Sequence, residues 1–166
     1  MKYLQLLFLF VTICTTTTAQ LVVQVYDGDT YKILHEGKLQ VIRLANVDAP
    51  ELKQYYGANA KNAVSKLILD KNVTIEFTGL SSYHRKIAKV RVDGISIDSF
   101  LLVQGLAWHY LPYSTNNPSF TFYERKAQAS GIGMWRCLYN IPPWIWRRFN
   151  KREKRLNEMC RWTFRF

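Results

Sequence analysis

Five short segments in the first hundred positions are rich in β-branched and apolar residues, and the last of them alternates apolar with polar residues, a period of two that is typical of half-buried β-strands. The predicted strands span residues 21–26, 30–35, 39–47, 73–78 and 86–92. Asp93-Gly94 then predicts a tight hairpin turn into a short segment at 95–97. In the third strand Arg43 shares a face with Val41 and Ala45, so its guanidinium is expected to point inward or to lie on a rim.

Three segments predict helices. The first follows Gly57 and has one apolar stripe, formed by Ala60, Val64, Leu67 and Ile68. The second has Asp98 as its expected N-cap and stops at Gly105, and the third runs from an Asn117 cap to Gly131. Five strands, with a helix after the third and two more at the end, predict an α+β fold built on a small five-stranded barrel.

The N-terminal residues 1–19 read as a cleaved secretory signal. Lys2 supplies positive charge, an apolar run covers 4–14, and Ala19 closes a short polar segment, so the mature chain is expected to begin at Gln20. The apolar run is too short for a good transmembrane helix. We therefore expect secretion, either to the outside of the cell or to a periplasm.

The C-terminal segment 140–166 is expected to extend a domain that covers residues 20–139. It begins with Ile141-Pro142-Pro143-Trp144-Ile145-Trp146-Arg147-Arg148 and continues with many lysines and arginines. Its tryptophans could pack back on the barrel, while its basic residues could hold nucleic acid or touch an anionic envelope.

Two cysteines remain once the signal is removed, Cys137 and Cys160. In an oxidising compartment they could form a disulfide that ties the tail to the domain. The alternative is two unpaired thiols, because the sequence alone does not show whether the two residues meet.

Composition narrows the classes of protein and of partner. The chain has 166 residues, of which 48% are hydrophobic and 21% charged, values typical of one globular domain rather than a disordered chain. Its formal net charge of +11 indicates either a polyanionic partner or a generally basic surface.

The candidate chemistry lies mainly between residues 27 and 51, which contain D-G-D-T, R-L and V-D-A-P-E. These motifs contribute the acids Asp29, Asp48 and Glu51 together with Arg43, and Arg85 follows in S-S-Y-H-R. Carboxylates that bind a hard cation, another that activates water, and two guanidinium groups are what phosphodiester hydrolysis with one metal ion requires. In this context the basic charge favours nucleic acid as the partner.

The order D-G-D-T, R-L-x-x-V-D-x-P-E, Y-x-R resembles the staphylococcal (thermo)nuclease family, and the resemblance runs from about residue 22 to residue 135. It implies an OB-type barrel and a Ca²⁺ ion held by Asp29, Asp48 and the backbone carbonyl of Ala49, where the family usually has Thr. It further implies that Glu51 is the general base. The expected phosphate clamps are Arg43 and Arg85.

Two features of these motifs leave alternatives open. Asp27 could support the metal ligands from behind or could simply stabilise the turn at Gly28. Near Arg85 the family commonly has an acid and a Gly where this chain has Ser81 and His84, and a His restricts the backbone where Gly does not.

Aromatic residues after Gly105 suggest how the substrate is held. The resembled family places aromatic residues that face the nucleotide here, which implies a contact for Tyr113, while His109 could either contact the nucleotide or lie in the core. Tyr83, earlier in the chain, is also expected to contact the substrate, and aromatic rings stack on bases with little sequence preference. Trp108 is expected in the core. Single-stranded or unpaired DNA and RNA are therefore the expected partners of a monomer that needs no stable protein partner.

The sequence thus predicts a secreted Ca²⁺-dependent nuclease that acts on DNA and RNA with low sequence specificity. Two alternatives remain at this point. One is a noncatalytic OB-fold module that only binds nucleic acid. The other is an envelope-interaction protein that acts through its basic tail.

Overall fold

The computed structural model describes residues 20–114 and 117–156. Its strands are β1 (Gln20–Val25), β2 (Thr30–His35), β3 (Lys38–Leu44), β4 (Val47–Asp48), β5 (Asn72–Ser82), β6 (Arg85–Val92), β7 (Ile95–Ser96) and β8 (Trp108–His109). Its α-helices are α1 (Gly57–Ile68), α2 (Ile97–Val103), α3 (Pro118–Ala129), α4 (Pro143–Trp146) and α5 (Lys151–Leu156), and a 3-10 turn covers Gly133–Arg136. The predicted signal peptide lies outside the described residues.

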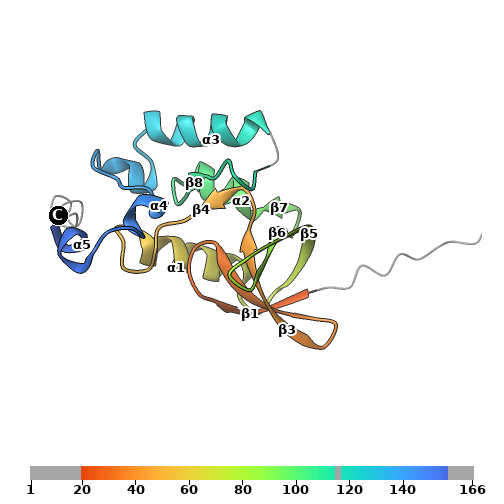
Figure 1. The fold of residues 1–166 in the computed structure, drawn as a ribbon. Helices are drawn as coiled ribbons and strands as arrows, with labels where there is room; N and C mark the ends of the chain where they lie inside the picture. The colour runs from red at the N-terminus through yellow and green to blue at the C-terminus, as the bar shows by residue number, and fades with distance from the viewer. Residues whose placement is uncertain (1–19, 115–116, 157–166) are drawn as a thin grey trace, which may run out of the picture.

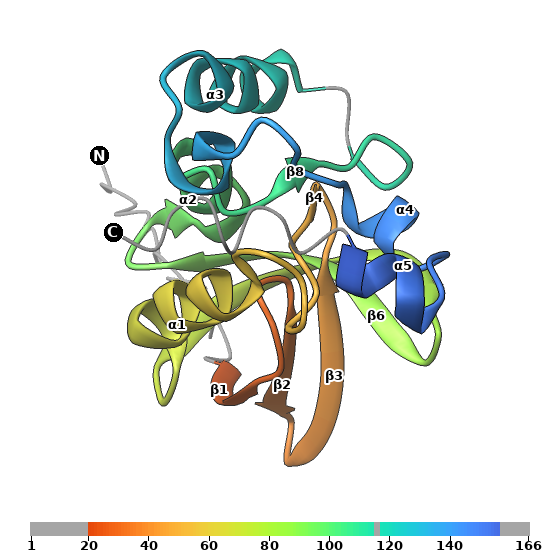
Figure 2. The same ribbon diagram turned by 90° about the vertical axis from the view of Figure 1, so that its left-hand side faces the viewer.

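Five strands close into a barrel. The sheet order is β3-β2-β1-β5-β6-β7, and β3 also pairs with β6 in parallel, which joins the two ends of the five-stranded part. β4 and β8 form a separate two-stranded ladder. Figures 1 and 2 show α1 and α3 on opposite sides of that ladder. The predicted α+β fold with a five-stranded OB-type barrel is confirmed.

The barrel interior follows the alternation seen in the sequence. The apolar side chains that fill it come from every strand of the barrel and from α1 and α2, among them Val22, Tyr31, Ile33, Ile42, Leu44, Val64, Ile68, Val90 and Leu101. Removing such apolar surface from water is the main favourable contribution to folding.

The third strand ends earlier than predicted, at Leu44 rather than at residue 47. Asn46 leaves the ladder because its backbone N–H and its side-chain amide both donate to Oδ1 of Asp98, at 3.0 and 3.2 Å. Val47 and Asp48 then pair with β8 instead. Because of this corner Asp48 lies outside the barrel sheet, on the ladder with β8.

The predicted buried stripe of α1 and the predicted cap of α3 are confirmed, and the predicted cap of α2 is wrong. Helix α1 buries Ala60, Val64 and Ile68, and the Asn117 side chain caps α3 by accepting from the Ser119 N–H at 3.0 Å. The cap of α2 is Ser96, not Asp98 as predicted. Asp98 is wrong as a cap because its carboxylate is turned inward to hold Asn46.

The tail adds two short helices, α4 and α5, to the three that were predicted. Figure 1 shows both, in blue, on the opposite side of the molecule from the turn between β2 and β3. Within the described ranges, no helix combines the length and the apolar character needed to cross a membrane.

Candidate active site

The turn between β1 and β2 presents the first acid. Asp27 accepts hydrogen bonds from the backbone N–H groups of Asp29 and Thr30, at 3.1 and 2.8 Å, so its carboxylate shapes the turn. A Cβ at Gly28 would lie 2.6 Å from the Cβ of Ala49, so only Gly allows this close approach. Burial, followed by the negative charge of Asp29, raises the pKa of Asp27 to about 7.

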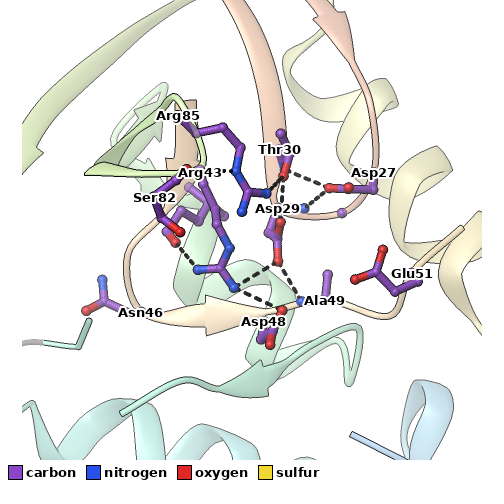
Figure 3. A network of polar contacts seen from close by, with 12 residues as sticks. Asp27, Asp29, Thr30, Arg43, Asn46, Asp48, Ala49, Glu51, Ser82 and Arg85 are labelled. Carbon is purple, nitrogen blue, oxygen red and sulfur yellow. Dashed lines mark hydrogen bonds and ion pairs between the residues drawn. The ribbon is translucent and has the colours of Figure 1, made fainter. Parts of the chain in front are cut away.

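Arg43 brings two acids together. Its Nη2 lies 2.9 Å from Oδ1 of Asp48 and 3.6 Å from Oδ2 of Asp29. All three residues are buried. Figure 3 shows Arg43 and Arg85 reaching into the same space, with Asp29 and Asp48 facing Arg43. A buried guanidinium needs such partners, because an unpaired buried charge is strongly unfavourable.

The charged groups in this cluster shift one another's pKa values. Burial lowers the pKa of Arg43, but the two neighbouring carboxylates raise it more, so the guanidinium stays charged. Burial raises the pKa of the Asp48 carboxyl, and the charge of Asp29 adds to that effect, although arginines favour the ionised form. Repulsion between two close carboxylates is relieved when a cation lies between them.

The segment after β4 places Glu51 at the edge of the same site. The Ala49 N–H donates to Oδ2 of Asp29 at 2.8 Å, which ties this segment to the first turn. The Glu51 side chain is 37% exposed. A Cβ at Gly57 would lie 1.9 Å from the carbonyl oxygen of Glu51, so only Gly at the start of α1 allows the two backbones to approach this closely.

Arg85 follows a tight turn between β5 and β6. Tyr83 and His84 have φ angles of 49° and 61°, in the left-handed region that favours Gly. His84 therefore occupies the strained conformation that the departure from the family pattern suggested. Arg85 nevertheless faces the site, where its Nη1 lies 3.4 Å from Oγ1 of Thr30 and its Nε donates to the Ser82 carbonyl at 3.3 Å.

A cleft of about 460 Å³ joins these groups. Its lining combines arginines and aromatic rings with one acid and one serine, namely Arg43, Arg85, Arg147, Arg148, Tyr83, Tyr110, Tyr113, Trp144, Glu51 and Ser82. The rings of Tyr110 and Tyr113 lie over the Arg43 guanidinium, with centroids 5.0 and 5.7 Å from its Cζ. Of the three predicted nucleotide contacts, Tyr83 and Tyr113 line this cleft.

His109 is the exception. Its two ring nitrogens contact side-chain oxygens, with Nδ1 3.1 Å from Oγ1 of Thr121 and Nε2 2.8 Å from Oγ of Ser114. Burial lowers its pKa, which favours the neutral ring. The structure thus places His109 between α3 and the loop after β8, and it does not line the cleft.

Comparison with known proteins agrees with this geometry. The family model described as Staphylococcal nuclease homologue matches residues 41–137, more than half of the chain. The chain belongs to the staphylococcal nuclease family. As a member of this family it is a nuclease, an enzyme that hydrolyses phosphodiester bonds. The matched range includes Arg43, Asp48, Glu51 and Arg85 but begins after Asp29.

Bacterial and plant relatives support the same assignment. A protein of Escherichia coli O157:H7 named as an uncharacterized endonuclease is 36% identical over 127 residues, which cover 76% of this chain and 82% of the relative. One of the same name from Haemophilus influenzae is 38% identical over 131 residues, 78% of this chain and 73% of the relative. A probable staphylococcal-like nuclease of rice is 37% identical over 107 residues, 64% of this chain but 28% of the relative.

The cleft is also lined by residues that were not predicted as part of the site. Tyr110, Trp144, Arg147 and Arg148 line the cleft. Three of them come from the tail, where the run Pro-Pro-Trp-Ile-Trp-Arg-Arg was the only signal in the sequence. Trp144 packs edge-on against Trp108, with ring centroids 6.5 Å apart. The predicted tail boundary at residue 140 stays a prediction, but the tail's first turn is part of the cleft.

The site contains two carboxylates, of Asp29 and Asp48, that could bind a metal ion. Within the described residues, no group of three or more His, Cys, Asp or Glu side chains is arranged to hold a metal ion. Asp29 and Asp48 do converge on one cationic group, the Arg43 Nη2, and their oxygens suit a hard cation. The donor set therefore fits a Ca²⁺ ion that keeps several water ligands.

Only one cysteine of the predicted disulfide lies within the described residues. Cys137 is buried and disulfide-bonded. Cys160 lies outside the described residues, so its pairing with Cys137 stays a prediction.

Proposed function

We propose that this nuclease is Ca²⁺-dependent and that it hydrolyses phosphodiester bonds in DNA and RNA with low sequence specificity. The observation that carries the proposal is the convergence of Asp29 and Asp48 on Arg43, in a cleft that also contains Glu51 and Arg85. Those residues are the minimum set for binding a cation, activating water and stabilising a phosphoryl group.

Asp29 and Asp48 would hold the cation, together with the carbonyl oxygen of Ala49 and water molecules. When bound, Ca²⁺ would polarise a phosphate oxygen and make a nearby water more acidic. The buried carboxylates contribute a fixed, negatively charged seat, and the bond from the Ala49 N–H to Asp29 keeps the two sides of that seat together.

Glu51 is proposed as the general base. Its partly exposed carboxylate lies in the cleft, where it can take a proton from a water molecule as the water oxygen attacks phosphorus. The bond from phosphorus to the departing oxygen then breaks, and that oxygen takes up a proton from the surrounding water. Negative charge accumulates on the phosphoryl oxygens during this step, and Arg43 and Arg85 are placed to stabilise it.

The aromatic wall of the cleft suits unpaired strands. Tyr83, Tyr110, Tyr113 and Trp144 expose rings on which bases can stack whatever their sequence. A duplex keeps its bases stacked inside, so single strands are the favoured substrate. We further propose that the protein acts as a monomer after secretion and cleavage near Ala19.

A noncatalytic module would be expected to lack some of the acids or arginines, yet all of Asp29, Arg43, Asp48, Glu51 and Arg85 are present. An envelope-interaction protein would need a free basic tail. The start of this tail is instead engaged in the cleft, which favours the nuclease.

The decisive experiment compares the mature protein with its Glu51→Gln variant, each with Ca²⁺ and with EGTA. Glutamine keeps the size of the side chain but cannot accept the proton, so turnover should fall by roughly 10²–10⁴-fold while single-strand affinity stays similar. EGTA should abolish cleavage by the parent. Glu36→Gln, at an exposed turn, is the matched control and should behave like the parent. Full activity of Glu51→Gln, or cleavage that ignores EGTA, would contradict the proposal.

A further inference from the structure

Arg147 of the tail binds the two acids on which the proposed chemistry depends. Its Nη2 lies 2.7 Å from Oδ2 of Asp48, and its Nη1 lies 2.9 Å from Oε1 of Glu51. Nη1 also donates to Oδ1 of Asp48 at 3.2 Å. These are charge-assisted hydrogen bonds in a two-pronged geometry, the strongest class of side-chain contact available to arginine.

Packing of the tail against the barrel positions the guanidinium of Arg147. The side chain of Trp146 is buried, and Trp144 packs against the rings of Trp108 and Tyr110. The Gln54 side-chain amide donates to the Ile141 carbonyl, which ties the start of the tail to the loop that follows Glu51. Arg147 therefore arrives at the site because the segment before it folds onto the barrel.

The contacts of Arg147 use atoms that a metal ion and a base would need. Both carboxylate oxygens of Asp48 accept from arginines, and Oε1 of Glu51 accepts from Arg147. Oδ1 of Asp48 already accepts from both Arg43 and Arg147, and a divalent cation bound to Asp48 would repel the guanidinium of Arg147, so the two cations compete for this carboxylate. The structure thus contains a positive group of the chain itself where the proposed cation would bind.

The two arginines at Asp48 differ in how easily they can leave. The Arg43 side chain is only 4% exposed, donates a hydrogen bond to Asp48 and forms an ion pair with Asp29, so it is a fixed part of the site. The Arg147 side chain is 44% exposed. Water can therefore reach its guanidinium, which could exchange the carboxylates for water or for a phosphate in the cleft that it already lines.

We propose that Arg147 is a built-in competitor of the divalent cation, so that the docked tail keeps the nuclease in a resting state until the cation displaces the guanidinium from Asp48 and Glu51. This inference rests on the proposed Ca²⁺ dependence. It assigns to the tail a regulatory contact within the active site, and it makes the apparent metal affinity a property of the tail as well as of the ligands.

The test is Ca²⁺ binding measured by titration calorimetry on the full mature protein without nucleic acid. Arg147→Gln should bind Ca²⁺ about tenfold or more tightly than the parent, because the competing cation is gone. Arg148→Gln is the matched control, since it removes the same charge one residue away and no hydrogen bond of Arg148 to Asp48 or Glu51 is seen in the described structure. Its affinity should change only slightly.

Measuring the Ca²⁺ affinity of Arg147→Lys is a second test, in which the positive charge at this position is kept. A lysine keeps the positive charge but cannot grip two carboxylates at once, so its Ca²⁺ affinity should lie between those of the parent and Arg147→Gln. Thermal melting with and without Ca²⁺ should agree: Arg147→Gln should melt lower than the parent in EGTA and gain more from Ca²⁺.

The outcomes separate the two proposals. Equal Ca²⁺ affinity for Arg147→Gln and Arg148→Gln would overturn the competition while leaving a Ca²⁺-dependent nuclease intact. If neither the parent nor any variant binds Ca²⁺, the proposed cation is wrong, and the inference about Arg147 is wrong with it.

Discussion

At the scale of single residues, Arg43 organises the site. An arginine on a strand among apolar neighbours needs partners, and the structure supplies carboxylates on one side and the rings of Tyr110 and Tyr113 on the other. The rings attract the guanidinium through their negative faces. This arrangement leaves a planar, permanently charged group at the cleft, held in one orientation before any substrate arrives.

Replacing Arg43 with lysine tests whether that orientation matters. An ammonium keeps the charge but cannot bind two phosphate oxygens in a fixed fork, so Arg43→Lys should reduce turnover by roughly 10²–10³-fold. Steady-state cleavage of a single-stranded oligonucleotide measures this. Arg91→Lys, on an exposed part of β6, is the control and should cut like the parent. Near-parental turnover of Arg43→Lys would remove this residue from the proposed mechanism.

At the scale of elements, the corner between β3 and β4 decides where Asp48 lies. Asn46 turns the chain because Asp98, 52 residues later at the start of α2, accepts two of its hydrogen bonds. Burial raises the pKa of Asp98 to about 6, against an ordinary value of 3.8. The native state therefore holds the proton of Asp98 more tightly than the unfolded chain does.

This shift predicts a pH-dependent stability. Between about pH 4 and pH 6 the unfolded chain has released the proton of Asp98 while the native protein still holds it, so the contribution of Asp98 to stability falls as the pH rises, then stays level. Asp98→Asn can accept the same bonds without ionising. Relative to this variant, the parent's free energy of unfolding should drop by something on the order of 3 kcal/mol between pH 4 and pH 7.

Urea unfolding of both proteins at several pH values provides the measurement, and the difference between them removes contributions from every other titrating group. A difference that is constant from pH 4 to pH 7 would show that Asp98 has an ordinary pKa in the folded protein.

At the scale of the whole molecule, positive charge and the cleft act together. The chain has a formal net charge of +11, and four arginines line the cleft beside its aromatic wall. Two of these arginines, Arg43 and Arg147, are already paired with acids. Part of the attraction for nucleic acid must therefore come from basic residues elsewhere on the surface. Binding of nucleic acid should therefore be strongly electrostatic.

Salt provides the test at this scale. If the protein neutralises about four phosphates of a single strand, its affinity should fall roughly 50-fold between 50 and 200 mM salt. Fluorescence anisotropy with the Glu51→Gln variant measures binding without cleavage. An affinity that hardly changes over this range would argue that stacking on the cleft's rings, rather than phosphate contact, holds the substrate.

The sequence alone determined features that are encoded within a few residues. Strand alternation, the buried stripe of α1 and the Asn117 cap depend on neighbours along the chain, and all three were predicted correctly. The acids and arginines singled out from their order in the chain do lie together in the structure, and their catalytic and metal-binding roles stay predictions. Neither set of predictions depends on knowing how the barrel closes.

Only the tertiary structure decided the contacts that join distant segments. The early end of β3 and the inward turn of Asp98 depend on a pair 52 residues apart, and the grip of Arg147 on Asp48 and Glu51 spans 99 and 96 residues. Local periodicity contains no information about such pairs, because they depend on how the barrel closes and on where the tail packs. The contacts of the His109 ring with Thr121 and Ser114 were likewise visible only in the tertiary structure, and its predicted contact with the substrate stays a prediction.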